Sequence, residues 1–303
     1  MRNPAAAGGS ASCKGIAAWV LALASIVAAP CAGSARAAAI PSFDHVVVVV
    51  MENHGYSSII GNADAPYVNA LAAQGASFTA SYAVTHPSQP NYLAMYSGST
   101  QGVTTDSCPQ DFAGVANLGG QLIAAGRSFV GYAEDLPAAG YTGCSAGLYV
   151  RKHNPWVDFD DVPPGSNQPF SAFPTDFSLL PDVAFLIPNQ CNNTHDCAIA
   201  VGDAWLQAHV DAYAQWAKTH ESLLILTWDE DAGEDANRIV TLFVGAHVLA
   251  GEYAEPTGHY RTLATLQAMH GLPAIGATVG LAPVTDIWSD IVFSDGFEGA
   301  PLR

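Results

Sequence analysis

Short polar segments follow several strongly apolar runs of this sequence, and they contain the side chains that could perform chemistry. Glu52-Asn53-His54 follows one such run and Asp229-Glu230-Asp231 follows another. A third polar segment carries Ser88 between two prolines, and a fourth carries His195. Three consecutive carboxylates would repel one another in a dry site unless a cation or protons neutralised them. Together, these oxygen and imidazole groups predict a site for a hard divalent cation.

Alternating strands and helices are expected to bring these segments together. The apolar runs predict strands at 43–51, 77–84, 128–133, 183–187, 223–228 and 239–244, and helices at 66–74, 92–96, 118–125, 198–219 and 260–269. This alternation favours an α/β fold, a three-layer α/β/α domain with a central, mostly parallel sheet. In such a sheet, ligands bind beyond the carboxyl ends of the strands, and all four polar segments fall at that edge.

Each polar residue also has a simpler explanation when it is taken alone. An acidic residue after a strand is more often a helix cap or part of a solvated turn. His195 could be satisfied by a backbone carbonyl, and Ser88 could be an ordinary turn residue. The convergence of all four segments at one end of the predicted sheet is what favours the cation site.

Residues 134–181 lose the periodic pattern and are rich in proline and glycine, which indicates functional loops rather than a linker. Arg151 and Lys152 lie in this region, and only 10 of the 303 residues are Lys or Arg. Two interpretations remain open for this pair. They could bind a substrate phosphate or a lipid head group, or they could pair with a surface carboxylate.

The amino-terminal 38 residues have the features of a signal peptide. Arg2 and Lys14 precede and flank an apolar run at 16–29, and Ala35-Arg36-Ala37 resembles a cleavage site. A helix of 14 residues spans about 21 Å, less than the roughly 30 Å of a bilayer core, so we expect no stable membrane anchor. We expect a secreted or periplasmic protein with a single catalytic domain at 39–290 and a C-terminal tail at 291–303.

The charge of the chain limits its partners. A formal net charge of −17 argues against nucleic acid and against anionic membrane surfaces, because both repel an acidic protein. An anionic substrate is still compatible with this charge if a bound cation reverses the sign locally.

Four cysteines remain after residue 38, and in an oxidising compartment an even number indicates disulfides. Three connectivities are possible. The local spacings favour Cys108 with Cys144 and Cys191 with Cys197. A metal site is less favoured, since none of the four lies in a C-x-x-C pair.

Five segments of the sequence form an ordered set of motifs. In order, they are Val50-Met51-Glu52-Asn53-His54, His86-Pro87-Ser88-Gln89-Pro90-Asn91-Tyr92, Arg151-Lys152-His153-Asn154-Pro155, Pro188-Asn189 with His195-Asp196, and Thr227-Trp228-Asp229-Glu230-Asp231. This set resembles the phosphoesterase family, which includes bacterial acid phosphatases and phospholipases C within the alkaline phosphatase superfamily. The resemblance extends from about residue 43 to about residue 273, and the short chain is closest to the small secreted acid phosphatases.

The resemblance implies an alkaline-phosphatase-like fold and a metal site in which Ser88 is the nucleophile. Glu52 and Asn53 would be metal ligands, together with Asp229, Glu230 and Ser88 itself. Asp231 occupies a position where phospholipase relatives have histidine, which leaves its role open.

Other roles follow from the same resemblance. His195 would face the phosphoryl group or a second cation, and His153 would lie on the leaving-group side. Asn91 and His259 would contact substrate, as would Arg151 and Lys152 in the phosphate-binding interpretation.

The implied chemistry is metal-assisted hydrolysis of a phosphate ester through a phosphoserine. A divalent cation would lower the pKa of the Ser88 hydroxyl and neutralise a phosphate oxygen. A charged histidine would protonate the leaving alcohol, which favours activity at mildly acidic pH. The ligand set does not distinguish calcium, magnesium, manganese and zinc. Phosphomonoesters are the expected substrates, and phosphatidylinositol phosphates, nucleotides and sugar phosphates all remain open.

Three alternatives compete with this interpretation. The first is a phospholipase C-like phosphodiesterase. The second is a serine esterase, because Gly143-Cys144-Ser145-Ala146-Gly147 fits the G-x-S-x-G nucleophile elbow. The third is a metal-binding protein without catalysis, which would use the carboxylates but not Ser88.

Overall fold

The computed structural model describes residues 40–289. The predicted signal peptide at 1–38 and the predicted tail at 291–303 lie outside these residues. Between residues 40 and 289, no helix combines the length and the apolar character that crossing a membrane requires.

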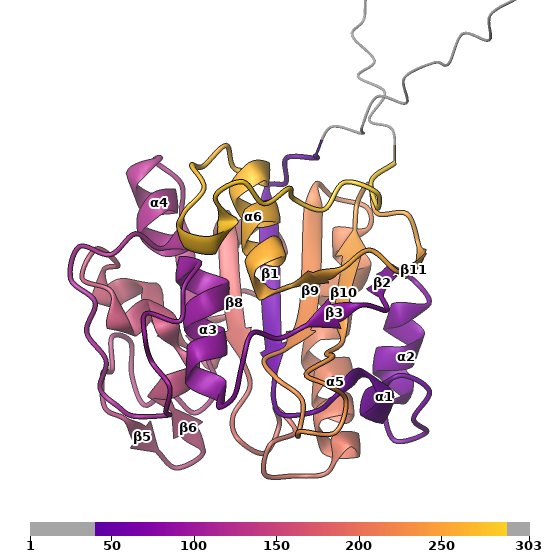
Figure 1. Cartoon of the computed structure of the whole chain (residues 1–303), viewed down its shortest axis with the longest axis horizontal. Coiled ribbons are helices and arrows are strands. Elements are labelled where there is room, and N and C mark those ends of the chain that lie inside the picture. The colour runs from indigo at the N-terminus through magenta and orange to yellow at the C-terminus, as the bar shows by residue number, and fades with distance from the viewer. Residues whose placement is uncertain (1–39, 290–303) are drawn as a thin grey trace, which may run out of the picture. The chain divides into compact units, whose positions relative to one another are not determined.

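A central eight-stranded sheet organises the domain, with the strand order β11-β2-β10-β9-β1-β8-β4-β7 (Figure 1). In this sheet β10 runs antiparallel to both of its neighbours, while all the other pairs are parallel. The predicted mostly parallel sheet is therefore confirmed. The strands are β1 (His45–Met51), β2 (Ala76–Phe78), β4 (Phe129–Ala133), β7 (Asn167–Pro169), β8 (Val183–Ile187), β9 (Ser222–Trp228), β10 (Thr241–Gly245) and β11 (Gly251–Tyr253).

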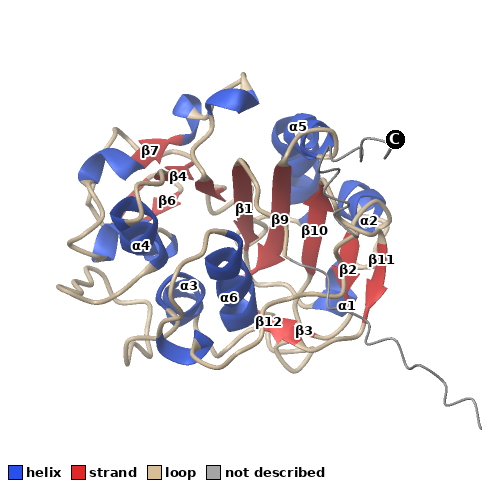
Figure 2. Cartoon of the chain, turned by 90° about the horizontal axis from the view of Figure 1, so that it is seen from above, coloured by secondary structure: helices blue, strands red, loops and turns tan. Residues whose placement is uncertain are grey.

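Each face of the sheet is covered by helices, as Figure 2 shows. Successive side chains of a strand point to opposite faces, so the five valines of β1 divide between two hydrophobic cores. Val46, Val48 and Val50 pack in one core with residues of α3, α4 and α6, and Val47 and Val49 pack in the other with α2 and α5. The predicted three-layer α/β/α arrangement is confirmed. The helices are α1 (Tyr56–Ile59), α2 (Pro66–Ala72), α3 (Ser88–Ser97), α4 (Leu118–Ala124), α5 (Ile199–Ala217) and α6 (His259–Met269).

The segment between β2 and α3 differs from the strand predicted at 77–84. The chain leaves the main sheet after Phe78, and β3 (Ser81–Tyr82) pairs instead with β12 (Thr257–Gly258) in a separate two-stranded sheet. The spacing of apolar residues predicts a strand but does not identify the strand that it pairs with, so the sequence could not predict that β3 leaves the main sheet. The consequence is that the chain crosses in front of the main sheet and begins α3 at Ser88, four residues before the predicted helix start (Figure 1).

The loop region 134–181 is irregular, as predicted, and contains only short elements. These are β5 (Ser145–Ala146), β6 (Tyr149–Val150), β7 and the 3₁₀ turns η1 (Arg151–His153), η2 (Pro155–Asp158), η3 (Pro164–Ser166), η4 (Phe170–Ala172) and η5 (Phe177–Leu179). A further 3₁₀ turn, η6 (Gly276–Thr278), follows α6.

Both predicted disulfides are confirmed. Cys108–Cys144 joins the loop after α3 to the β5–β6 hairpin, and Cys191–Cys197 closes the loop after β8. The serine-esterase alternative is wrong. A nucleophile elbow needs a strand followed by a helix, whereas Ser145 lies in an antiparallel hairpin and its neighbour Cys144 is in a disulfide.

Candidate active site

The polar segments after β1 and β9 meet the start of α3 at one edge of the sheet. The two strands are parallel neighbours and pair Met51 with Trp228, so Glu52 and Asp229 leave the sheet side by side. The Asn53 N–H donates to Asp229 Oδ1 at 3.0 Å, which joins the two segments beyond the strands. Asn53 has a φ of 58°, a left-handed conformation that asparagine adopts more readily than most residues.

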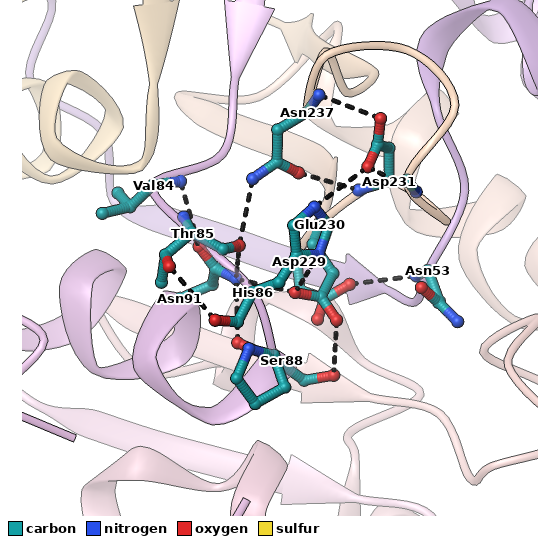
Figure 3. A network of polar contacts seen from close by, with 12 residues as sticks. Asn53, Val84, Thr85, His86, Ser88, Asn91, Asp229, Glu230, Asp231 and Asn237 are labelled. Carbon is teal, nitrogen blue, oxygen red and sulfur yellow. Dashed lines mark hydrogen bonds and ion pairs between the residues drawn. The ribbon is translucent and has the colours of Figure 1, made fainter. Parts of the chain in front are cut away.

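Ser88, the first residue of α3, lies between two carboxylates that follow different strands, Glu52 after β1 and Glu230 after β9. Figure 3 shows Ser88 beside Glu230. Its Oγ is 3.2 Å from Glu52 Oε2 and 3.2 Å from Glu230 Oε1. Ser88 is only 2% exposed. A buried hydroxyl held beside two carboxylates is arranged for chemistry rather than for solvation.

Glu52 is fully buried and held by an aromatic pair. Tyr92 OH donates to Glu52 Oε1, and His153 Nε2 lies 2.9 Å from the same oxygen. The His153 ring stacks on the Tyr92 ring with 4.8 Å between centroids. Burial by itself raises the pKa of Glu52, but the charge and hydrogen bond of His153 and the hydrogen bond of Tyr92 outweigh it and lower the pKa to about 2.

Glu230 has more polar and more open surroundings. His86 Nδ1 lies 2.9 Å from Glu230 Oε2, and His86 Nε2 lies 3.2 Å from Asp231 Oδ1. The His86 side chain is 46% exposed. Burial raises the pKa of Glu230 to about 7, because it outweighs the opposing charge of His86 and is reinforced by the charge of Glu52.

Asp229 is the carboxylate of this group whose negative charge is stabilised least by its neighbours. It is fully buried, and its Oδ2 has no hydrogen-bond partner. Burial raises its pKa well above the ordinary value, and the charges of Glu52 and Glu230 raise it further. His259 Nε2 lies 2.6 Å from the Asp229 carbonyl oxygen, and burial lowers the pKa of His259 to about 4, so that the neutral ring donates there.

This donor set suits a hard divalent cation. Within residues 40–289, no three His, Cys, Asp or Glu side chains form a group that could hold a metal by themselves. However, the Ser88 hydroxyl adds a neutral oxygen to the carboxylates of Glu52, Asp229 and Glu230, and oxygen ligands of these kinds are those that Ca²⁺ and Mg²⁺ bind. Asn53 contacts this group through its backbone N–H, and its expected role as a side-chain ligand stays a prediction. The unpartnered Asp229 oxygen and the mutual repulsion of the carboxylates are what a bound cation would resolve.

Comparison with known proteins identifies the family. The model of the phosphoesterase family matches residues 62–273. The chain belongs to the phosphoesterase family.

Named relatives agree with this assignment. The chain is 53% identical to a phosphatidylinositol-3-phosphatase of Mycobacterium tuberculosis over 84% of its length and 86% of the relative's. It is 32% identical to a phosphate-repressible acid phosphatase of Penicillium chrysogenum, covering 80% of this chain and 65% of the relative, and 31% identical to an acid phosphatase of Aspergillus fumigatus, covering 78% and 56%. The chain therefore spans less than two thirds of these two fungal relatives.

The fold resembles that of a solved structure in the alkaline phosphatase superfamily. A protein of the alkaline phosphatase superfamily from Vibrio parahaemolyticus superimposes with a TM-score of 0.56, at 15% identity, over 82% of this chain and 72% of that one. The family resemblance, the alkaline-phosphatase-like fold and the class of phosphoric ester hydrolase that the five motifs implied are all confirmed.

Asn91 of this phosphoesterase braces the segment before Ser88. Its Oδ1 accepts the backbone N–H groups of Val84 and Thr85, and its Nδ2 lies 3.2 Å from Glu230 Oε2 (Figure 3). Asn91 is fully buried. Because the protein itself occupies these polar atoms, Asn91 does not match the substrate-binding role expected from the sequence.

Asp231, whose role the sequence left open, organises the loop after β9. Its carboxylate accepts the backbone N–H groups of Gly233, Asp235 and Asn237, and it is fully buried. Burial raises the pKa of Asp231, but these three hydrogen bonds and the charge of His86 lower it overall. Asp231 thus supports His86 from the side opposite Glu230.

Arg151 and Lys152 are neighbours with different surroundings. Arg151 is buried, pairs with Asp158 at 2.8 Å, and donates to the carbonyl oxygens of Thr142 and Gln110. The substrate-binding expectation for Arg151 is therefore wrong, because its guanidinium N–H groups already donate to protein oxygens. Lys152 Nζ instead pairs with Asp106 Oδ2 at 2.7 Å.

Two of the three histidines with expected roles, His153 and His259, are buried. His153 is 1% exposed and its Nε2 lies 2.9 Å from Glu52 Oε1, so it supports that carboxylate, and its expected role on the leaving-group side stays a prediction. His195 pairs with Asp196 at 2.7 Å, with its side chain 31% exposed. His259 is buried against the Asp229 backbone rather than open to substrate.

Sequence reasoning assigned no role to Tyr92, His86 or Asp106. Tyr92 and His86 both lie within the motif that contains Ser88, so their proximity to it was a usable signal. Asp106 had no such signal, because its position depends on the path of an irregular loop.

Proposed function

We propose that this chain is a secreted or periplasmic, metal-dependent acid phosphatase that hydrolyses phosphomonoesters through a phosphoserine on Ser88. Membership of the phosphoesterase family and the names of the relatives support the reaction class. The observation that carries the proposal is the position of Ser88 Oγ, 3.2 Å from each of two carboxylates on separate segments.

Ser88 would attack phosphorus in line with the bond to the leaving alcohol. The new bond joins Ser88 Oγ to phosphorus while the hydroxyl proton passes to the adjacent carboxylate of Glu230. The bond from phosphorus to the alcohol oxygen breaks, and the alcohol takes up a proton from water. Water then attacks the phosphoserine, releases inorganic phosphate and restores the hydroxyl.

Glu52, Asn53, Asp229, Glu230 and Ser88 are the residues that would hold the cation. When bound, a divalent cation lowers the pKa of a neighbouring hydroxyl and neutralises charge on the phosphoryl oxygens. The donor set is compatible with calcium, magnesium, manganese or zinc.

The surrounding residues would hold this arrangement rather than react. Tyr92 and His153 orient Glu52 through one of its oxygens, which leaves the other to face Ser88. His259 fixes the backbone at Asp229. Lys152 supplies a positive charge next to the site, and we propose that it pairs with the substrate phosphate.

The substrate and the location are inferred from separate observations. The relative from Mycobacterium tuberculosis is named for phosphatidylinositol 3-phosphate, so we propose that phosphatidylinositol phosphates are among the substrates. Two disulfides suit an oxidising compartment outside the cytoplasm.

Replacement of the nucleophile tests the proposal. Ser88→Ala should lower turnover of a nitrophenyl phosphate by at least about 10³-fold, because no other hydroxyl would form the covalent intermediate. Its melting temperature should be largely retained, and it should still bind divalent cations in calorimetric titrations, with a lower affinity because one proposed ligand is lost. The matched control, Ser145→Ala, should be fully active.

The phosphoserine itself should be detectable on Ser88 by mass spectrometry after acid quench of the wild-type protein. Appreciable phosphatase activity in Ser88→Ala would refute the mechanism. Faster cleavage of phosphodiesters and phospholipids than of monoesters would favour the phospholipase C-like alternative instead.

A further inference from the structure

Asp106 makes two contacts at the edge of the site that the catalytic scheme does not use. Its Oδ1 accepts the backbone N–H of Gln89, the residue after Ser88, at 3.0 Å. Its Oδ2 lies 2.7 Å from Lys152 Nζ. A single carboxylate therefore joins a loop, the first turn of α3 and the turn η1.

Lys152 is close enough to the cluster to interact with it electrostatically. The charges of Glu52 and Asp229 help to raise the pKa of Lys152, together with Asp106, against the effect of burial, which is the largest influence and acts in the opposite direction. In turn, the charge of Lys152 helps to lower the pKa of Glu52. Asp106 joins this ammonium to the Gln89 N–H, next to Ser88, and the residue after Lys152, His153, lies 2.9 Å from Glu52. These contacts place Lys152 at the edge of the site where an anion would bind.

The pair is open to exchange with a ligand. The Asp106 side chain is 33% exposed and the Lys152 side chain 16% exposed, in contrast to the buried pair of Arg151 with Asp158. Partly exposed ion pairs contribute little to stability, so an incoming dianion can replace one partner at small cost. The disulfide at Cys108, two residues along the loop, keeps the Asp106 segment next to η1.

We propose that Asp106 is an internal competitor for the phosphate group, because its carboxylate holds the Lys152 ammonium that a bound phosphate would otherwise take. This inference rests on the proposed function. Asp106 then sets the affinity of the site for the phosphate dianion, and with it the inhibition by inorganic phosphate, the product of the reaction.

The proposed competition predicts whether a conservative substitution of Asp106 strengthens or weakens phosphate binding. Asp106→Asn keeps an oxygen that can accept the Gln89 N–H, but it removes the negative charge and releases Lys152. Inorganic phosphate should bind about three- to tenfold more tightly, as a lower inhibition constant and as a lower calorimetric Kd, measured at one fixed divalent-cation concentration in every arm. The difference should shrink at high salt.

Two further variants separate competition from a general charge effect. Asp111→Asn removes the same charge five residues along the same chain segment, from an exposed position, and should leave phosphate affinity unchanged. Lys152→Met should weaken phosphate binding, and adding Asp106→Asn to it should change the affinity little further. Melting temperatures of all four variants identify any that fail to fold, and Asp106→Ser then serves as a second test of the same charge removal.

Several results would overturn the inference. Unchanged or weaker phosphate binding by a folded Asp106→Asn would do so, and so would equal tightening in Asp111→Asn. Slower turnover of glycerol phosphate with unchanged turnover of an aryl phosphate would instead assign Asp106 to the hydroxyl groups of the alcohol.

Failure of the inference and failure of the proposed function are distinguishable. A chain that cleaves no phosphate ester, but whose Asp106→Asn variant binds inorganic phosphate more tightly, would refute the function alone. An active phosphatase whose Asp106→Asn variant binds phosphate no more tightly would refute the inference alone.

Discussion

The two carboxylates that flank Ser88 are equidistant from its hydroxyl but are supported in opposite ways. On the Glu52 side, defined by Glu52, Tyr92 and His153, every residue is at most 1% exposed, and the contacts come from a stacked aromatic pair. On the Glu230 side, defined by Glu230, His86 and Asp231, the linking histidine has a side chain that is 46% exposed.

This difference gives the two sides different pKa behaviour and different freedom to move. The Tyr92 and His153 contacts keep Glu52 ionised, with its pKa lowered to about 2, whereas burial raises the pKa of Glu230 to about 7. Close packing allows Glu52 little adjustment. Water can approach His86, so the Glu230 side can adjust when a ligand binds. We infer that the side chains on the Glu52 side stay fixed when a ligand binds, whereas those on the Glu230 side can adjust their positions.

Removal of the cation should have the largest effect, since both sides are proposed to share it. Exhaustive chelation should reduce turnover by at least about 10³-fold and should lower the melting temperature, because ligand binding to the folded state no longer contributes. Added divalent cation should restore both quantities. Full turnover in a preparation shown by elemental analysis to be metal-free would contradict the shared-cation proposal.

Substitution of each carboxylate should separate the two sides. We expect Glu52→Gln to lower kcat/KM by about 10³-fold, because its buried surroundings cannot replace the lost charge, and Glu230→Gln to lower it by only about 10- to 100-fold. Steady-state kinetics at saturating cation provides the measurement. Equal losses, or a greater loss in Glu230→Gln, would remove the distinction between a fixed and an adaptable side.

Substitution of the supporting residues should give the smallest effects and the same ranking. Tyr92→Phe deletes a buried hydrogen bond to a charged group, which should cost about 2 kcal/mol of unfolding free energy and about tenfold in cation affinity. His86→Asn should cost less in both, since solvent can replace its contacts. Calorimetric cation titrations and urea unfolding test this order, and a larger loss in His86→Asn than in Tyr92→Phe would reverse it.

Much of the site could be predicted because it depends on strand ends. Glu52 and Asp229 follow two apolar runs that were expected to be parallel strands, and parallel neighbours place their carboxyl ends together. Arg151 and Lys152 show where such reasoning stops. They are adjacent in sequence and in the same 3₁₀ turn, yet Arg151 forms a buried ion pair with Asp158 and Lys152 lies beside the site. Their order along the chain does not show that the two side chains make different contacts.

The alternation of strands and helices could be read from the sequence, as could the edge of the sheet at which Glu52, Ser88 and Glu230 collect and the pairing favoured for the four cysteines. These features depend on local periodicity, on chain direction and on short spacings. Three further contacts became visible in the folded structure alone: His153 supports Glu52, Asn91 braces the segment before Ser88, and Asp106 holds Lys152. Such contacts join residues from separate elements, and their geometry depends on how loops and side chains pack, which no local pattern of residue types encodes.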